Sequence, residues 1–166
     1  MPTRLGTYAF FRRLLHHRFL PLVICRLSRW AMINHIPALP QLLTYTNVVL
    51  FGIEVTPRCD IGPGFFLPHT SGTVIGAYRI GRDVTIFQNV TLGAKDLDSR
   101  FGPAQRPSIG DNVVLGAGCK VLGGITIGDR TRIGANSVVL ESMPEDATVV
   151  GIPARVVPRA SRETIE

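Results

Sequence analysis

A bulky aliphatic residue recurs at every sixth position through the second half of this sequence. The series is Ile109, Leu115, Val121, Ile127, Ile133 and Val139. An amphipathic helix would need apolar residues at spacings of three and four, and a half-buried strand would alternate them at every second position. A period of six is instead typical of a parallel β-helix, in which three short strands make one coil and stacked coils bury a continuous interior. We therefore predict a mainly β fold built around a parallel β-helix.

The same period extends towards the N-terminus in two shorter runs. One run comprises Val74, Ile80, Ile86 and Leu92, and the other comprises Val55, Ile61 and Leu67. The two runs differ in phase by one residue, which predicts an insertion directly after His69. A second interruption, from Gly93 to Ser108, shows no such period. Because a solenoid accommodates insertions as excursions from its corners, both interruptions are candidate functional features.

Three segments are expected along the 166 residues, which provide enough chain for one domain with a small addition. Residues 1–51 are predicted to form a helical cap or oligomer segment. Residues 52–142 are predicted to form the β-helix, with an extended loop at 94–107. Residues 143–166 are predicted to form a return strand and a charged tail.

The N-terminal segment is apolar with interleaved basic residues, which predicts amphipathic helices. We expect one helix capped by Thr7, a second over 20–33 and a third over 41–51. A β-helix exposes an unpaired strand edge at its first coil, and such edges recruit other chains unless something covers them. A cap or subunit contact is therefore the favoured role of these helices. The alternative is a peripheral anchor on a membrane surface, which has the same mixture of residues.

Charge and cysteine content exclude several function classes. The formal net charge is +6, but no run of five basic residues and no recognition motif accompanies it, so nucleic-acid binding is not expected. The three cysteines lie far apart in the sequence, at positions 25, 59 and 119. We interpret them as small buried residues of a protein from a reducing compartment. Neither a secretory signal nor a membrane span is predicted. We expect a cytoplasmic protein, peripheral at the inner face of the membrane if the helices serve as an anchor.

His69 is the one histidine inside the repeat array, at the corner where the phase changes. Glu54 precedes it by fifteen positions, and one coil takes about eighteen residues in a repeat of six. Glu54 is therefore expected one coil below on a nearby edge, where coils are roughly 4.8 Å apart. A carboxylate at that reach can hold one imidazole nitrogen as N–H and leave the other free as a general base.

The stretch from about 52 to 157 closely resembles the hexapeptide-repeat acyltransferases with a left-handed β-helix, and within them the serine O-acetyltransferase branch. The resemblance is carried by residues 52–57 (GIEVTP), 61–69 (IGPGFFLPH), 84–93 (VTIFQNVTLG), 109–123 (IGDNVVLGAGCKVLG) and 150–155 (VGIPAR). It implies a left-handed parallel β-helix and acetyl transfer from acetyl-CoA to a hydroxyl by direct attack. His69 falls on the family's catalytic histidine, and Glu54 falls on its acidic partner, which is an aspartate in the typical serine enzyme.

The resemblance also implies a homotrimer in which acetyl-CoA lies in a groove between two subunits. Small residues there let the pantetheine chain approach the backbone, and basic residues can pair with the CoA phosphates. By position the small residues are Ala94, Gly116, Ala117, Gly134 and Ala135. The candidate phosphate partners are Lys120, Arg132 and Arg155. No helical domain large enough to join two trimers is present, so a dimer of trimers is not expected.

Two departures from the serine enzymes concern the acceptor. Pro68 stands where they have an aspartate that helps to hold the amino acid, and Arg106 stands where they have a second histidine. Proline cannot supply a carboxylate for the ammonium group of serine, whereas the arginine fork suits sugar hydroxyls or nucleotide-sugar phosphates. The favoured acceptor is therefore a sugar of a surface polysaccharide or its precursor, as for the family's short members. The alternative is L-serine, as in cysteine biosynthesis.

Two other function classes are possible for this fold, a zinc enzyme and a non-catalytic β-helix. A zinc enzyme on this solenoid would need about three histidine ligands that converge between coils. The array contains only His69, so no metal is expected. A non-catalytic β-helix that acts as a scaffold or binding module is the remaining alternative, and detection of CoA-dependent transfer would exclude it.

Overall fold

Two helices precede a stack of short strands in the computed structural model, which describes residues 19–96 and 100–158. Helix α2 spans Leu20–Ile33, as predicted, and α3 spans Leu39–Phe51. Helix α3 begins two residues before its predicted start because Pro40 fits the first turn, where its missing N–H has no helical partner to lose. The helix predicted after Thr7 lies outside the described residues.

The strands form three sheets that enclose one interior, as expected for a parallel β-helix. Sheet A contains β1 (Ile53–Val55), β3 (Thr73–Ile75), β6 (Thr91–Gly93), β9 (Lys120–Leu122) and β12 (Val138–Val139). Sheet B contains β2 (Asp60–Ile61), β4 (Arg79–Ile80), β7 (Ser108–Ile109) and β10 (Thr126–Ile127). Sheet C contains β5 (Thr85–Ile86), β8 (Val114–Leu115), β11 (Arg132–Ile133), β13 (Thr148–Gly151) and β14 (Ala154–Val157).

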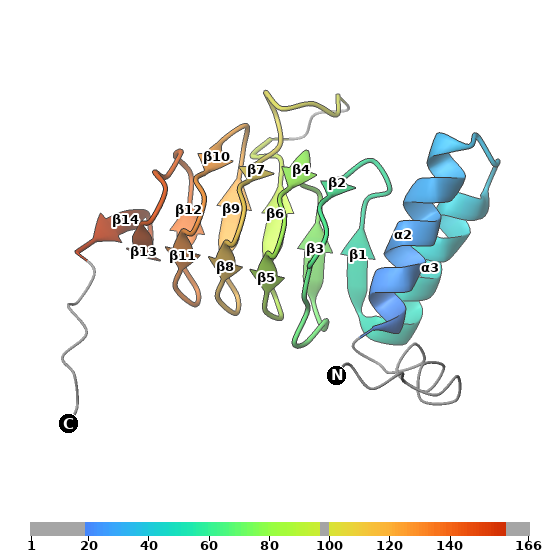
Figure 1. The fold of residues 1–166 in the computed structure, drawn as a ribbon, viewed down its shortest axis with the longest axis horizontal. Helices are drawn as coiled ribbons and strands as arrows, with labels where there is room; N and C mark the ends of the chain where they lie inside the picture. Colours follow the sequence, from blue (N-terminus) through green and yellow to red (C-terminus); the bar gives the residue numbers. More distant parts are fainter. Residues whose placement is uncertain (1–18, 97–99, 159–166) are drawn as a thin grey trace, which may run out of the picture.

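The chain visits the sheets in the order A, B, C and then returns to A one coil further along (Figure 1). Every strand pair is parallel except β13–β14, among the described residues. We name the three edges of the stack the A–B, B–C and C–A corners, after the sheets that the chain connects there.

The predicted ladder lines the interior, with one correction. Its members are buried, but Val74 is only half-buried and faces outward. Ile75 takes the interior position instead, where it is fully buried and in register with Val55 and Leu92. The phase error arises from the turn before β3, because Gly72 adopts a left-handed φ of 70° and lengthens the corner. Strand β3 therefore enters with Thr73 and Ile75 facing inward.

The helical hairpin covers the open end of the first coil (Figure 1). Arg29 Nη1 donates to the carbonyl oxygens of Arg58 and Cys59, both at 3.1 Å, and its Nη2 pairs with Asp60 at 2.9 Å. Arg26 donates to two further carbonyl groups of that coil. Inside the stack, a neighbouring coil would donate hydrogen bonds to such carbonyl groups. At this end of the stack, the two arginines donate them instead.

The C-terminal end of the stack differs from the prediction. The sequence predicts a single return strand there, but β13 and β14 form an antiparallel hairpin that turns at Ile152 and Pro153. Met143 bridges to Ile127 and is buried, so it contributes to the last coil.

Neither described helix has the length and apolar composition needed to cross a bilayer.

Candidate active site

His69 lies at the C–A corner of the first coil, where it is exposed to solvent. Its turn is tied to the preceding segment by two hydrogen bonds. Thr70 Oγ1 donates to the carbonyl oxygen of Phe51 at 2.8 Å, and the N–H of Gly72 donates to the carbonyl oxygen of Gly52 at 2.8 Å. The imidazole therefore projects from a corner whose backbone is held at both its start and its end.

Glu54 faces outward from β1, between the buried side chains of Ile53 and Val55. Its backbone is in register with Val74 of β3, so it lies one coil before the strand that His69 introduces, as predicted. Both side chains are exposed, and within the described residues no hydrogen bond or ion pair joins the Glu54 carboxylate to the His69 imidazole. Catalytic hydrogen bonds are often long in ligand-free enzymes and tighten in the complex. The dyad stays a prediction.

Lys120 belongs to the same outward stripe of sheet A as Glu54. The register runs from Glu54 through Val74 and Thr91 to Lys120. Lys120 Nζ donates to the carbonyl oxygen of Asn89 at 2.6 Å, so in a single chain this ammonium group is already engaged at the C–A corner. A phosphate at that corner would compete with a backbone carbonyl for it.

Four of the small residues assigned to acetyl-CoA form a strip along the C–A corner. Gly116 and Ala117 end one coil, and Gly134 and Ala135 end the next. A Cβ at Gly116 would lie 2.7 Å from the nitrogen of Ala135, which only glycine permits. The strip therefore presents bare backbone, on the same edge of the stack as His69.

The two remaining candidate cations lie elsewhere on the solenoid. Arg132 is exposed on the outer face of sheet C. Arg155 lies in the terminal hairpin, where it pairs loosely with Glu141 at 3.9 Å. Exposed pairs of this kind contribute little to stability, so both guanidinium groups can turn towards a ligand.

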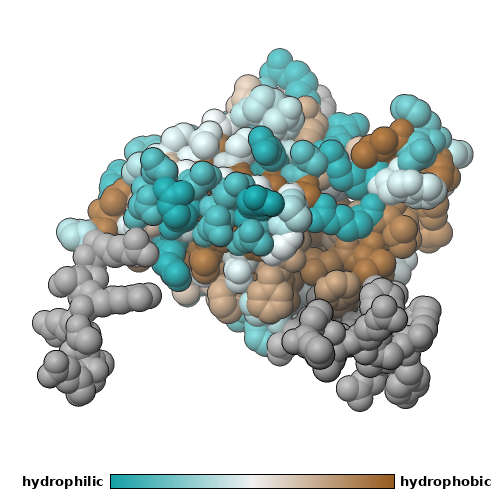
Figure 2. All heavy atoms as spheres, in the orientation of Figure 1, coloured by the Kyte–Doolittle hydropathy of each residue, from teal (hydrophilic) through white to brown (hydrophobic). Residues whose placement is uncertain are grey.

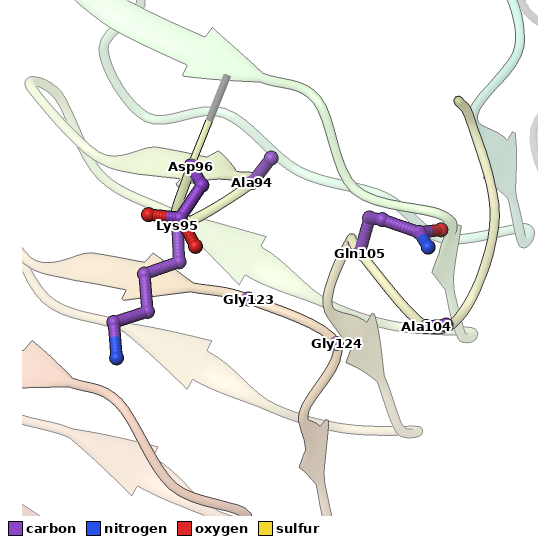
Figure 3. A pocket seen from close by; sticks show the side chains of 7 residues that line it. All are labelled: Ala94, Lys95, Asp96, Ala104, Gln105, Gly123 and Gly124. Atoms are coloured by element: carbon purple, nitrogen blue, oxygen red, sulfur yellow. The ribbon is translucent and has the colours of Figure 1, made fainter. Parts of the chain in front are cut away.

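The A–B corner carries the long loop and a pocket of about 210 Å³ beneath it. Figure 3 shows one wall formed by residues 94–96 and the other by Ala104 and Gln105, with Gly123 and Gly124 between them. A Cβ at Gly124 would lie 2.2 Å from the carbonyl oxygen of Ala104, so glycine is required for the loop to rest on this coil. Ala94 is thus in a pocket, but at a different corner from the other small residues.

Arg106 anchors the returning end of this loop. Its Nη1 donates to the carbonyl oxygen of Gly76 at 3.0 Å, and its guanidinium lies 5.1 Å from the centre of the Phe101 ring. Its Nε is buried and has no hydrogen-bond partner among the described residues. Only part of the guanidinium therefore remains available to an acceptor. A substrate-binding role for Arg106 stays a prediction, but a structural role is visible.

Phe101 is a site residue that the sequence did not indicate. The centre of its ring lies 6.2 Å from the centre of the Tyr78 ring. The Arg58 guanidinium lies 5.9 Å from the centre of the Phe101 ring. These contacts hold the loop against the first two coils by aromatic and cation–π attraction. One aromatic residue in an aperiodic stretch carries no pattern that would predict this role.

Pro68 is half-buried directly before His69 and offers no side-chain hydrogen bond. The three cysteines are free and buried, and burial raises the pKa of each thiol to about 12. None of them is a thiolate nucleophile at neutral pH. The described residues contain no group of three potential metal ligands.

Comparison with known proteins identifies the family. The profile of the family described as "Bacterial transferase hexapeptide (six repeats)" matches residues 106–141. The serine acetyltransferase of Synechococcus elongatus is 44% identical over 143 residues, which are 86% of this chain and 57% of that protein. The serine acetyltransferase of Helicobacter pylori is 46% identical over 121 residues, which are 72% of this chain and 67% of that protein.

Solved structures of serine acetyltransferases share the fold. The Neisseria gonorrhoeae enzyme superposes with a TM-score of 0.81 at 32% identity, over 90% of this chain and 56% of that one. The soybean enzyme complexed with serine gives a TM-score of 0.81 at 32% identity, over 92% of this chain and 61% of that one. A serine acetyltransferase in complex with CoA gives a TM-score of 0.75 at 35% identity, over 84% of this chain and 56% of that one.

This chain spans little more than half the length of most of these relatives. The shared part contains the repeat array and the corners that carry the candidate residues. Together with the parallel three-sheet stack, these matches confirm the predicted fold class. The chain belongs to the hexapeptide-repeat acyltransferases, with a left-handed parallel β-helix, in the branch of the serine acetyltransferases.

Proposed function

We propose that this protein is an O-acetyltransferase that moves the acetyl group of acetyl-CoA to the hydroxyl of L-serine. The observation that carries the proposal is the identity of 40–46% with proteins named serine acetyltransferase, over 72–86% of this chain. The polysaccharide acceptor expected from Pro68 and Arg106 has no support from these relatives, so we replace it with the serine acceptor.

The chemistry assigned to His69 needs its imidazole ring, an acceptor hydroxyl and the thioester of acetyl-CoA. One imidazole nitrogen takes the proton of the acceptor hydroxyl as that oxygen attacks the acetyl carbonyl carbon. The new ester C–O bond forms, the thioester C–S bond breaks, and the proton passes to the departing thiolate. Glu54 would hold the other ring nitrogen as N–H and favour the charged imidazolium.

The C–A corner suits the co-substrate because its strip of small residues leaves the backbone open. Gly116 and Gly134 admit no side chain without a clash, since a Cβ at Gly134 would lie 2.8 Å from Val150 Cγ1. A thin pantetheine chain can therefore approach the strip closely. Arg132 and Arg155 are exposed cations that could pair with its phosphates.

We also propose a homotrimer, because the candidate residues divide between two corners of sheet A. His69 and the strip of small residues lie at the C–A corner, whereas Ala94, the pocket and Arg106 lie at the A–B corner. A head-to-tail contact joins different patches of two copies and closes into a ring. Such a contact would bring one copy's A–B corner to its neighbour's C–A corner. Sedimentation should then give the mass of three chains.

An acceptor screen tests the proposed activity. Purified protein with acetyl-CoA is assayed for free thiol release with L-serine, L-threonine, monosaccharides, nucleotide sugars and oligosaccharides, with His69→Ala as the control for uncatalysed release. Serine-dependent release that His69→Ala abolishes supports the proposal. Release with a saccharide but not with serine would contradict the acceptor assignment and leave the transferase class intact. Absence of release with every acceptor would favour a non-catalytic solenoid.

A further inference from the structure

Gln88 carries a buried polar atom without a partner, at the corner that presents His69. Its side-chain oxygen Oε1 is buried and has no hydrogen-bond partner among the described residues. Two other side-chain atoms of the described chain share this state, Asn47 Oδ1 in the helical hairpin and Arg106 Nε at the loop anchor. Buried acceptors without a donor are costly and rare, so each needs an explanation. At the C–A corner, that explanation must come from what Gln88 faces.

Backbone register places Gln88 one coil beyond His69. Before the corner, Phe66 bridges to the first residue of β5. After the corner, the N–H of Asn89 donates to the carbonyl oxygen of Ser71 at 3.0 Å. The coil that contains Gln88 therefore runs alongside the turn that begins at His69, and neighbouring coils are roughly 4.8 Å apart. A small molecule bound between the imidazole and the next coil would lie against Gln88.

The strip of small residues begins on the other side of Gln88. The N–H of Gly118 donates to the carbonyl oxygen of Gln88 at 2.9 Å, which puts Ala117 beside Gln88 on the next coil. The order along the corner is thus His69, Gln88 and Ala117. A thioester that reaches from the strip towards the imidazole ends at the level of Gln88. The attacking acceptor must lie there as well.

We infer that Gln88 Oε1 accepts a hydrogen bond from the ammonium group of L-serine, an inference that rests on the proposed function. The ammonium group has three N–H donors and gives up its hydration when it enters the site. Pro68, directly before His69, offers no side-chain acceptor, and the Glu54 carboxylate is assigned to the imidazole. Gln88 as a whole is only half-buried, so a change of its side-chain rotamer can turn the oxygen towards the surface of the corner.

Lys120 fixes the orientation of the amino acid at this corner. Its Nζ donates to the carbonyl oxygen of Asn89, the residue after Gln88, at 2.6 Å. A positive charge at this point attracts the carboxylate of serine and repels its ammonium group. A serine whose carboxylate faces Lys120 therefore directs its ammonium group away from that cation, where the neutral amide of Gln88 can accept an N–H.

Acetyl transfer by the variant Gln88→Met tests this contact. Methionine keeps an unbranched side chain of similar length but lacks the amide. The kcat/KM for L-serine should fall by about ten- to a hundredfold, which is the value of a hydrogen bond to a charged group. The inhibition constant of 3-hydroxypropanoate, which is serine without its ammonium group, should stay unchanged. KM for acetyl-CoA should stay unchanged as well.

Two further variants and a stability measurement complete the test. Gln88→Glu keeps an acceptor oxygen and should retain most of the kcat/KM for L-serine. Gln41→Met is the matched control, because Gln41 is exposed in α3, at the end of the molecule where Figure 2 shows hydrophobic residues gathered. Its kinetics should equal those of the unmodified protein. Tm of Gln88→Met should equal or exceed that of the unmodified protein, because the substitution removes a buried acceptor without a partner.

Four results would overturn the inference alone. Unchanged kinetics of Gln88→Met would show that the amide contacts neither substrate. Equal weakening of L-serine and 3-hydroxypropanoate would show that Gln88 acts through the shape of the corner. A change confined to KM for acetyl-CoA would assign the amide to the pantetheine chain, and a lowered Tm would show that Oε1 has a partner within the protein. Absence of serine-dependent thiol release by the unmodified protein would instead overturn the proposed function, and this inference with it.

Discussion

Replacement of Gly124 by alanine should force the long loop away from the solenoid. The new Cβ would lie 2.2 Å from the carbonyl oxygen of Ala104 and 2.4 Å from its carbonyl carbon. Carbon and oxygen atoms of this kind approach to roughly 3.3 Å at best. The coil and the loop must therefore separate by about 1 Å, since both partners are backbone and neither can rotate away.

The loop cannot make that movement freely, because its returning end is anchored. Arg106 is bonded to the carbonyl oxygen of Gly76, and Phe101 lies against Tyr78 and two guanidinium groups. Overpacking of a constrained site costs about 1–3 kcal/mol. For a chain of this size each kcal/mol lowers Tm by about 2–4 °C. A central value of about 2 kcal/mol therefore predicts a decrease in Tm of about 4–8 °C for Gly124→Ala.

Gly93→Ala is the matched control, at the same corner of the stack. No atom lies within 4 Å of the position that its new Cβ would take, and its φ is not left-handed, so Tm should be unchanged or slightly higher. Calorimetry on both variants measures the difference. If the two variants have the same Tm, the loop does not press on Gly124 and the reasoning fails. In a protein that also carries Arg106→Ala, which frees the loop, Gly124→Ala should lower Tm by less than it does alone.

Three further predictions concern the site and the buried thiols. His69→Ala should lower kcat by about two to four orders of magnitude with Tm nearly unchanged, and Glu54→Gln should lower it less; full activity of His69→Ala would refute the assignment. Arg106→Ala should raise KM for the acceptor more than KM for acetyl-CoA, and equal small effects would favour a purely structural arginine. The raised thiol pKa values mean that unfolded thiols ionise above about pH 9 while folded ones stay protonated to about pH 12. The free energy of unfolding should therefore fall across that window in denaturant titrations, and substitution of the three cysteines by alanine should reduce the slope.

The fold could be predicted in detail because the repeat is a direct consequence of the geometry. Each coil turns three corners, and each corner follows one inward side chain, so a period of six is the only pattern that keeps every aliphatic residue inside. Ile127 and Leu115, read from that period, are fully buried. Helix α2 was predictable from local signals in the sequence. Pro21 fits the first turn of a helix, and Asn34 caps its C-terminal end.

Irregular segments escaped prediction because their geometry depends on partners distant in sequence. The phase at β3 is set by the turn at Gly72, whose N–H is bonded to the carbonyl oxygen of Gly52. The period of six predicts Val74 as the interior residue, whereas the register with Val55 places Ile75 there. Phe101 is similar, since its partners Arg58 and Tyr78 belong to two earlier coils.

The division of the site between two corners has a consequence for how activity should depend on assembly. His69 precedes β3 and Gly76, the anchor of Arg106, follows it, so the two corners are separated by a strand of roughly 10 Å. Close-packed coils cannot bend to join them. In the proposed trimer the neighbour supplies the missing corner, whereas each solenoid keeps its own core. Dilution that dissociates the subunits should therefore abolish acetyl transfer while the parallel sheets remain folded, and transfer by an isolated folded subunit would show that one corner is sufficient.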